Sequence, residues 1–105
     1  MKVLVIWRVK EDADLSQIER MLLEEERFAW RSYLSDELRE HYESDMPTPA
    51  ISILEAESVD AAKEQLKGLP ILKAGLMTAE FFPLRPFKNW EVLFKDEEKT
   101  GLEVS

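Results

Sequence analysis

The order of apolar and polar segments along the chain predicts an α+β fold, in which one antiparallel sheet carries two helices on one face. The clearest observation is the segment 51–76, which reads as a buried strand, a capped helix and a helix stop in immediate succession. The apolar run at residues 2–9 and the alternating run at residues 76–84 supply a first and a last strand.

Residues 2–9 are apolar at alternate positions and also between them, a pattern typical of a central strand that is covered on both faces. After a polar break, Ser16 and Glu19 have the spacing of a capping box, which predicts a helix over residues 16–34. At about 100° per residue, Glu25 falls in the apolar stripe of this helix. The members of that stripe are Leu15, Ile18, Leu22, Ala29 and Tyr33.

Polar and apolar residues alternate over residues 35–45, which predicts an amphipathic second strand. Regular alternation places Arg39 and His41 on one face of this strand. It places Glu40 and Tyr42 on the other face, together with Leu38.

The prolines of residues 46–49 predict a turn into a third strand at residues 50–56. Ser58 is a good N-cap for the second helix, and Gly68 with Pro70 predicts a left-handed helix cap and a stop. A brief turn at residues 71–75 then leads to the fourth strand at residues 76–84.

The resulting order is β-α-β-β-α-β, which with right-handed crossovers gives a ferredoxin-like sandwich. We expect a single domain at residues 1–88, followed by a C-terminal extension at residues 89–105 with an aromatic part and a polar end. Since the first and last strands are apolar on both sides, a lone sheet would expose a large apolar patch. The sequence therefore predicts a homodimer, with the aromatic part of the extension docked on a neighbouring subunit and the polar end frayed.

Composition excludes several classes of function. The net charge of −8 repels a phosphate backbone, so no nucleic-acid partner is expected. The apolar start of the chain is interrupted at residues 7–12, so the apolar run is too short for a secretory or membrane-spanning segment. We therefore expect a cytoplasmic protein and no membrane partner. There is no cysteine, only one histidine, and no nucleotide-binding glycine motif, so no metal and no cofactor are expected.

The helix start at residues 58–62, the Leu69-Pro70 pair and the strand end Pro83-Leu-Arg-Pro86 resemble the muconolactone isomerase-like family. The similarity covers most of residues 1–88. The strand at residues 38–42 and the turn at residues 74–76 resemble a branch of the family other than the isomerase itself. The resemblance implies a dimeric α/β barrel with a pocket for a small organic molecule. It also implies that polar groups in this pocket transfer a proton beside a carbonyl without a cofactor.

Proton abstraction beside a carbonyl requires a base and a donor that stabilises the enolate oxygen. Glu25 is the candidate base because it lies in an apolar stripe, although a rolled helix or an arginine partner would also explain it. His41 and Tyr42 are candidate donors or acids, against the alternatives of a surface histidine and a core tyrosine.

Trp7 and Trp30 are candidates to line an apolar cavity, and ordinary core packing is the alternative for both. Arg39, Glu40 and Arg85 are candidate ligand-binding groups. For Arg85 the competing interpretation is an ion pair between subunits.

The leading hypothesis is a homodimer that binds a carbonyl or lactone metabolite and acts as a cofactor-free isomerase. The main alternative is a non-catalytic oligomerisation or partner-binding module, with a closed interior and Glu25 paired to a basic group. A further alternative is a cofactor-free monooxygenase-like protein, which requires a pocket that exposes His41 or Trp30.

Overall fold

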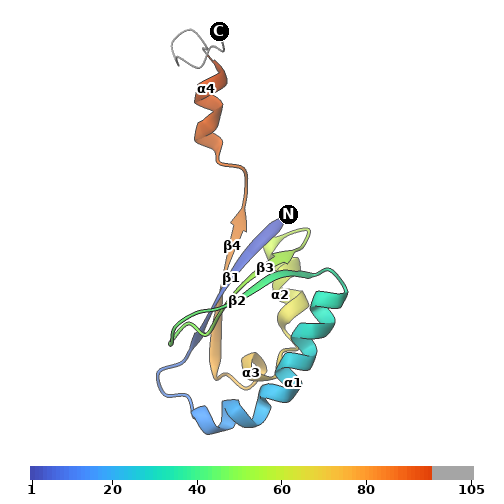
Figure 1. The fold of residues 1–105 in the computed structure, drawn as a ribbon, viewed down its shortest axis with the longest axis vertical. Helices are drawn as coiled ribbons and strands as arrows, with labels where there is room; N and C mark the ends of the chain where they lie inside the picture. Colours follow the sequence, from blue (N-terminus) through green and yellow to red (C-terminus); the bar gives the residue numbers. More distant parts are fainter. Residues whose placement is uncertain (96–105) are drawn as a thin grey trace.

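The computed structural model describes residues 1–95 and contains a four-stranded antiparallel sheet with the strand order β2-β3-β1-β4. The three helices α1, α2 and α3 lie on one side of this sheet (Figure 1). The element order and the antiparallel pairing confirm the predicted α+β, ferredoxin-like fold. The elements of the sheet and of this helical layer are β1 (Lys2–Val9), α1 (Leu15–Leu34), β2 (Leu38–Glu43), β3 (Ala50–Glu55), α2 (Val59–Leu66), α3 (Pro70–Lys73) and β4 (Met77–Leu84).

Strand β1 lies between β3 and β4, as its apolar sequence predicts. Its side chains Val3, Val5 and Trp7 are buried against the helices, whereas Leu4 and Ile6 on the opposite face are only half-buried. The core joins these inward residues to Leu54 of β3 and Ala62 of α2. Because β1 pairs on both edges, it fixes the position of the other strands relative to one another.

Helix α1 begins one residue earlier than predicted, and its cap is Asp14 rather than Ser16. The Asp14 carboxylate accepts hydrogen bonds from the backbone N–H groups of Ser16, at 3.0 Å, and Gln17, at 3.4 Å. Ser16 is already helical and donates its hydroxyl to the same carboxylate. The capping-box prediction is therefore wrong, because an aspartate two residues upstream reaches the free N–H groups first.

The inward face of α1 ends at Ser32 rather than at Tyr33. Tyr33, which an ideal helix would place on this face, is half-exposed, and Ser32 is buried in its place. The prediction that Tyr33 belongs to the buried stripe is wrong. Glu25 lies on the inward face as predicted, beside Ala29.

Strand β2 contains a bulge that the sequence prediction missed. Leu38 pairs with Leu54 and Glu40 pairs with Ile53, so Arg39 is an extra residue on β2. The bulge places Leu38 and His41 on the helix-facing side, where regular alternation predicted them on opposite sides.

The segment after α2 also differs from the prediction. Gly68 does not have a positive φ; it is required because a Cβ there would lie 2.9 Å from the ring of Phe28. Pro70 begins the short helix α3 instead of ending a helix, and the left-handed residue is Gly75, with φ 74°. The predicted turn at residues 71–75 is thus mostly helical.

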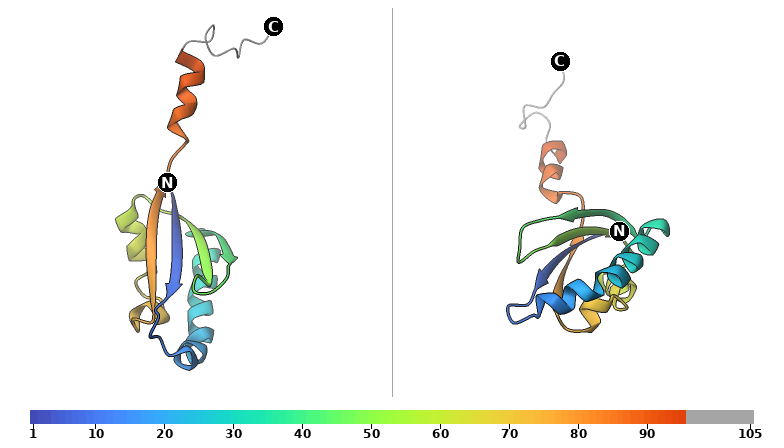
Figure 2. Two further views of the ribbon diagram at one scale, coloured as in Figure 1. Left: turned by 90° about the vertical axis from the view of Figure 1, so that its left-hand side faces the viewer. Right: turned by 60° about the horizontal axis from the view of Figure 1, so that its bottom comes forward.

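The face of the sheet opposite the helices has no covering element among residues 1–95 (Figure 2, left). The strand register places apolar side chains on this face. Beyond β4 the 3-10 helix η1 (Lys88–Glu91) and α4 (Val92–Lys95) extend away from the sheet (Figure 1). Phe87, Trp90 and Phe94 on this segment are each more than 60% exposed. The predicted polar end begins at Lys95, and its residues 96–105 lie outside the described residues.

Candidate functional site

A cavity of about 550 Å³ lies between the helix-facing side of the sheet and α1. Its volume is that of a site for a small organic molecule. Small side chains on both walls leave this space open, since Ala29 and Ser32 on α1 face Ala50 and Ser52 on β3. Larger apolar side chains complete the walls, among them Trp7, Ile18, Leu22, Phe28, Leu38, Leu54, Leu66, Leu69, Ile71 and Met77.

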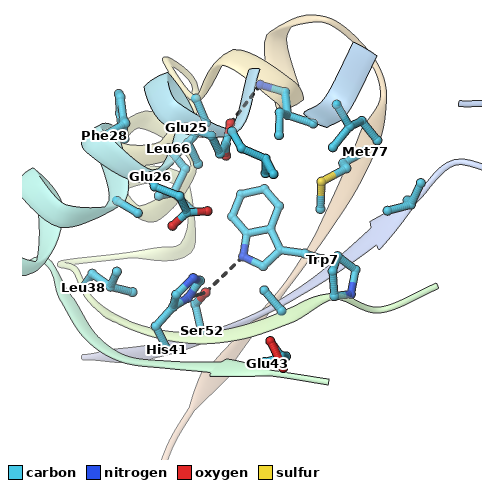
Figure 3. Close-up of a pocket in the computed structure, with 18 of the residues that line it drawn as sticks. Trp7, Glu25, Glu26, Phe28, Leu38, His41, Glu43, Ser52, Leu66 and Met77 are labelled. Atoms are coloured by element: carbon cyan, nitrogen blue, oxygen red, sulfur yellow. Dashed lines mark hydrogen bonds between the residues drawn. The ribbon is translucent and has the colours of Figure 1, made fainter. Parts of the chain in front are cut away.

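Three polar side chains from three strands form a connected chain on the sheet side of the cavity. The Trp7 Nε1–H donates to Ser52 Oγ at 3.0 Å, and Ser52 Oγ lies 2.8 Å from His41 Nδ1. Figure 3 shows the three groups on the floor of the cavity. The β2 bulge is what brings His41 opposite Ser52 in this register.

The buried position of Ser52 indicates which ring nitrogen of neutral His41 accepts its hydroxyl hydrogen. Ser52 is only 2% exposed, so its hydroxyl hydrogen needs an acceptor inside the protein. Since Trp7 can only donate, His41 Nδ1 is the acceptor that remains among the described contacts of this hydroxyl. Neutral His41 then carries its proton on Nε2, a hydrogen-bond donor for the cavity.

Glu25 lies on the opposite wall and joins α1 to the start of α3. Its Oε1 accepts a hydrogen bond of 2.9 Å from the backbone N–H of Ile71, the second residue of α3. Burial raises the pKa of the Glu25 carboxyl, and the nearby Glu26 charge raises that pKa further, while the bond from Ile71 acts in the opposite direction. Glu25 therefore stabilises the packing of α3 and also presents a carboxyl with a perturbed pKa to the cavity.

Two further carboxylates, Glu26 and Glu43, line the same cavity. Figure 3 shows the Glu26 carboxylate pointing inward, toward His41 and the Trp7 indole. Glu26 and Glu43 are both exposed residues, so they border the cavity where it is open to solvent.

Of the predicted site residues, the structure brings Glu25, His41 and Trp7 together around the cavity. Tyr42 reaches only its rim, because the Tyr42 hydroxyl donates to the Glu40 carboxylate at 2.7 Å on the exposed side of β2. That hydrogen bond to an anion raises the pKa of the Tyr42 phenol.

The other predicted ligand-binding residues lie outside this cavity. Trp30 is 60% exposed and stacks on Tyr33. Arg39 and Glu40 border a shallow hollow with Lys2 and Glu55. Arg85 follows the end of β4 and is exposed. The structure therefore separates these four residues from Glu25 and His41.

Ser52 is the site residue that sequence reasoning missed most clearly. It occupies an inward position of β3 between two apolar inward residues, Ala50 and Leu54. A serine at an inward position of a strand needs a polar partner, and this signal was available in the sequence.

Within residues 1–95, no group of three or more His, Asp or Glu side chains is arranged to hold a metal ion. The helices of this part of the chain include none with the length and apolar character needed to cross a membrane.

Comparison with solved structures identifies the fold. The crystal structure of muconolactone isomerase superimposes with a TM-score of 0.65 at 20% identity, over 83% of this chain and 91% of that one. The chain has the muconolactone isomerase-like fold. A second structure with this fold is 5-chloro-2-hydroxyhydroquinone dehydrochlorinase from Burkholderia phenoliruptrix, in complex with 2,5-dihydroxybenzoquinone. It gives a TM-score of 0.66 at 17% identity, over 85% of this chain and 98% of that one.

No protein-family profile matches the sequence, and no curated protein matches it either. The muconolactone isomerase-like fold expected from the sequence is confirmed.

Proposed function

We propose that this protein binds a small ring compound in the cavity between α1 and the sheet and transfers a proton beside its carbonyl group without a cofactor. The observation that carries the proposal is the position of His41 and Glu25, a carboxyl of raised pKa, on facing walls of one largely apolar cavity. Solved enzymes with this fold, an isomerase and a dehydrochlorinase, support an enzymatic role.

In the proposed reaction Glu25 removes the hydrogen next to the carbonyl as a proton. Its raised pKa makes it a stronger base than an exposed glutamate. The His41 Nε2–H donates to the carbonyl oxygen, where negative charge develops as the enolate forms. Return of the proton to a different carbon completes an isomerisation, so no atom is gained or lost.

The rival hypothesis of a non-catalytic module predicted a closed interior and a basic partner for Glu25. The cavity is open, and the described partner of Glu25 is a backbone N–H. The geometry therefore favours ligand binding. The monooxygenase-like alternative required His41 or Trp30 in a pocket, and only His41 meets that condition. Oxygen uptake with hydroquinone as the substrate, measured with an electrode, tests that alternative.

The isomerase proposal is tested with α-angelica lactone, a small lactone whose double bond moves into conjugation when a proton is transferred. We expect the protein to accelerate this shift, followed by ultraviolet absorbance, and Glu25→Gln to slow it at least about a hundredfold. Glu24→Gln is the matched control, because Glu24 is exposed and pairs with Arg27. An equal rate for the wild type and Glu25→Gln would remove Glu25 from the mechanism.

We also propose that the protein is a homodimer that pairs the helix-free faces of two sheets. The outer face presents apolar side chains from three strands, which a monomer would leave partly exposed to water. They are Leu4, Ile6, Ile51, Ile53, Phe82 and Leu84. A cytoplasmic location remains part of the same proposal.

A further inference from the structure

The charged side chains that line the cavity all have the same sign. Glu25, Glu26 and Glu43 contribute carboxylates, and the described residues that line the cavity include no lysine or arginine. The ion pairs described within residues 1–95 do not involve these three glutamates either. Mutual repulsion is already visible, since Glu26 raises the pKa of Glu25.

A ligand that enters this cavity exchanges water for apolar walls and carboxylate oxygens. Carboxylates accept hydrogen bonds but donate none, so they match hydroxyl and ammonium groups. A carboxylate on the ligand would lose hydration and would be repelled by the lining glutamates. No lining lysine or arginine offsets this repulsion, and His41 offers the ligand a single hydrogen-bond donor.

The Trp7 indole on the sheet side of the cavity adds a second preference. The Trp7 indole is held by its hydrogen bond to Ser52 and forms part of the apolar floor (Figure 3). An aromatic ring packs on such a surface, and an attached ammonium group gains from the indole as well as from the carboxylates.

We infer that the ligand of this cavity is a neutral or cationic ring compound with hydroxyl or amino donors, and that ring compounds with a carboxylate are rejected. The inference rests on the proposed function and narrows its substrate class. It also assigns a role to Glu26 and Glu43, which the proton-transfer scheme leaves unused: they select the ligand by charge.

Three probes of nearly equal size test the inference, because they share a phenol ring and differ in the end of a short side chain. Tyramine ends in an ammonium group, tyrosol in a hydroxyl group and 4-hydroxyphenylacetate in a carboxylate. Binding is followed by tryptophan fluorescence in a Trp30→Phe, Trp90→Phe background. Trp30 and Trp90 are both at least 60% exposed, and their replacement leaves Trp7 in the cavity as the reporter.

At pH 7 and low salt we expect tyrosol and tyramine to bind at least about tenfold more tightly than 4-hydroxyphenylacetate. Glu26→Gln with Glu43→Gln should weaken tyramine binding and strengthen binding of the carboxylate probe, so that the preference shrinks several-fold. Glu24→Gln with Glu64→Gln is the matched control. It changes the net charge equally, but both residues lie outside the cavity and pair with Arg27 and Lys67.

Tighter binding of 4-hydroxyphenylacetate than of tyrosol would overturn the inference while leaving the cavity a ligand site. The inference would also be overturned if Glu24→Gln with Glu64→Gln reduced the preference for tyramine as much as Glu26→Gln with Glu43→Gln. If none of the three probes changes Trp7 fluorescence at millimolar concentration, both the inference and the proposed ligand-binding function are overturned.

Discussion

Glu25 connects the cavity to the fold, because one carboxyl group both accepts the Ile71 N–H and lines the cavity. A glutamine keeps an oxygen for that N–H and carries no charge, whereas an alanine leaves the N–H without its partner. The two substitutions therefore separate the structural role of Glu25 from the cost of its charge.

We expect Glu25→Ala to lower the free energy of unfolding by about 1 kcal/mol, since the N–H at the start of α3 loses its acceptor. Glu25→Gln should cost less, and its stability relative to the wild type should improve as the pH rises. Because the folded-state pKa of Glu25 is raised above 4.5, its protonated form is favoured in the folded state, and that stabilisation is lost as the pH rises through the raised value. Chemical denaturation between pH 4 and pH 8 measures both effects, and a pH-independent difference between Glu25→Gln and the wild type would contradict this account.

In the proposed reaction Ser52 acts through His41 rather than on a ligand, which makes it a positioning residue. Because Ser52 Oγ lies 2.8 Å from His41 Nδ1 and accepts from Trp7, we expect its hydroxyl to donate to Nδ1 and the neutral ring to carry its proton on Nε2.

Replacement of Ser52 by alanine removes that constraint, so we expect a mixture of the two neutral tautomers of His41. Nitrogen-15 NMR measures the tautomer directly, and His41 is the single histidine of the chain, so its signals need no assignment. Ser52→Thr, which retains the hydroxyl, is the control. Observation of the Nδ1–H tautomer in the wild type would show that Ser52 accepts from His41 instead.

At the scale of the element, helix α1 is capped by a residue other than the serine that the sequence pattern indicates. Ser16 with Glu19 has the spacing of a capping box, but Asp14 performs the capping. The hydrogen bonds from Ser16 and Gln17 lower the pKa of Asp14 because they favour its charged form.

Asp14→Ala should lower the thermal midpoint at pH 7 more than Ser16→Ala does, and Asp14→Asn should restore most of the loss. The folded-state pKa of Asp14 lies below 3.8, so its contribution is present above that value and is lost as the pH falls through the lowered pKa. Thermal unfolding followed by circular dichroism at pH 7 and pH 3 gives the comparison. A larger effect from Ser16→Ala would restore the capping-box interpretation.

The β2 bulge is the element that assembles the sheet side of the site. One extra residue, Arg39, moves His41 to the same side as Leu38 and opposite Ser52. Without the bulge, regular alternation would place His41 on the opposite face of the sheet from Leu38 and the cavity.

For the whole molecule, the helix-free face of the sheet matters most, because a monomer would leave its apolar side chains partly exposed to water. Leu4 and Ile6 belong to the central strand β1, and Phe82 is 37% exposed on the neighbouring strand β4. A charge at Phe82 would be buried without a partner in a dimer that uses this face, but would be solvated in a monomer.

Native mass spectrometry of the wild type should show a dimer at about 10 μM, a concentration at which interfaces of standard size are occupied. Phe82→Glu should shift the population to monomer, while Leu23→Glu, on an exposed part of α1, should leave the dimer intact. A monomeric wild type would remove the proposed interface.

The sequence by itself determined the elements, because the signals that specify them are local. The alternation of residues 2–9 and 77–84 and the Ser58 cap each depend on a few neighbouring residues, and all were predicted near their observed positions. Glu25 was also identified correctly as a carboxylate on the inward face of α1.

Only the tertiary structure decided which polar groups meet. Ser52 finds His41 through the register of β2 on β3, and Glu25 finds Ile71 across 46 positions of sequence. Neither contact follows from periodicity, because a bulge shifts a strand by one residue, and the partner of an inward helical side chain depends on how the helices pack. The charge of the cavity follows from the same packing. In the sequence Glu26 and Glu43 resemble ordinary surface glutamates, and only the packing of α1 against the sheet brings both to the same cavity.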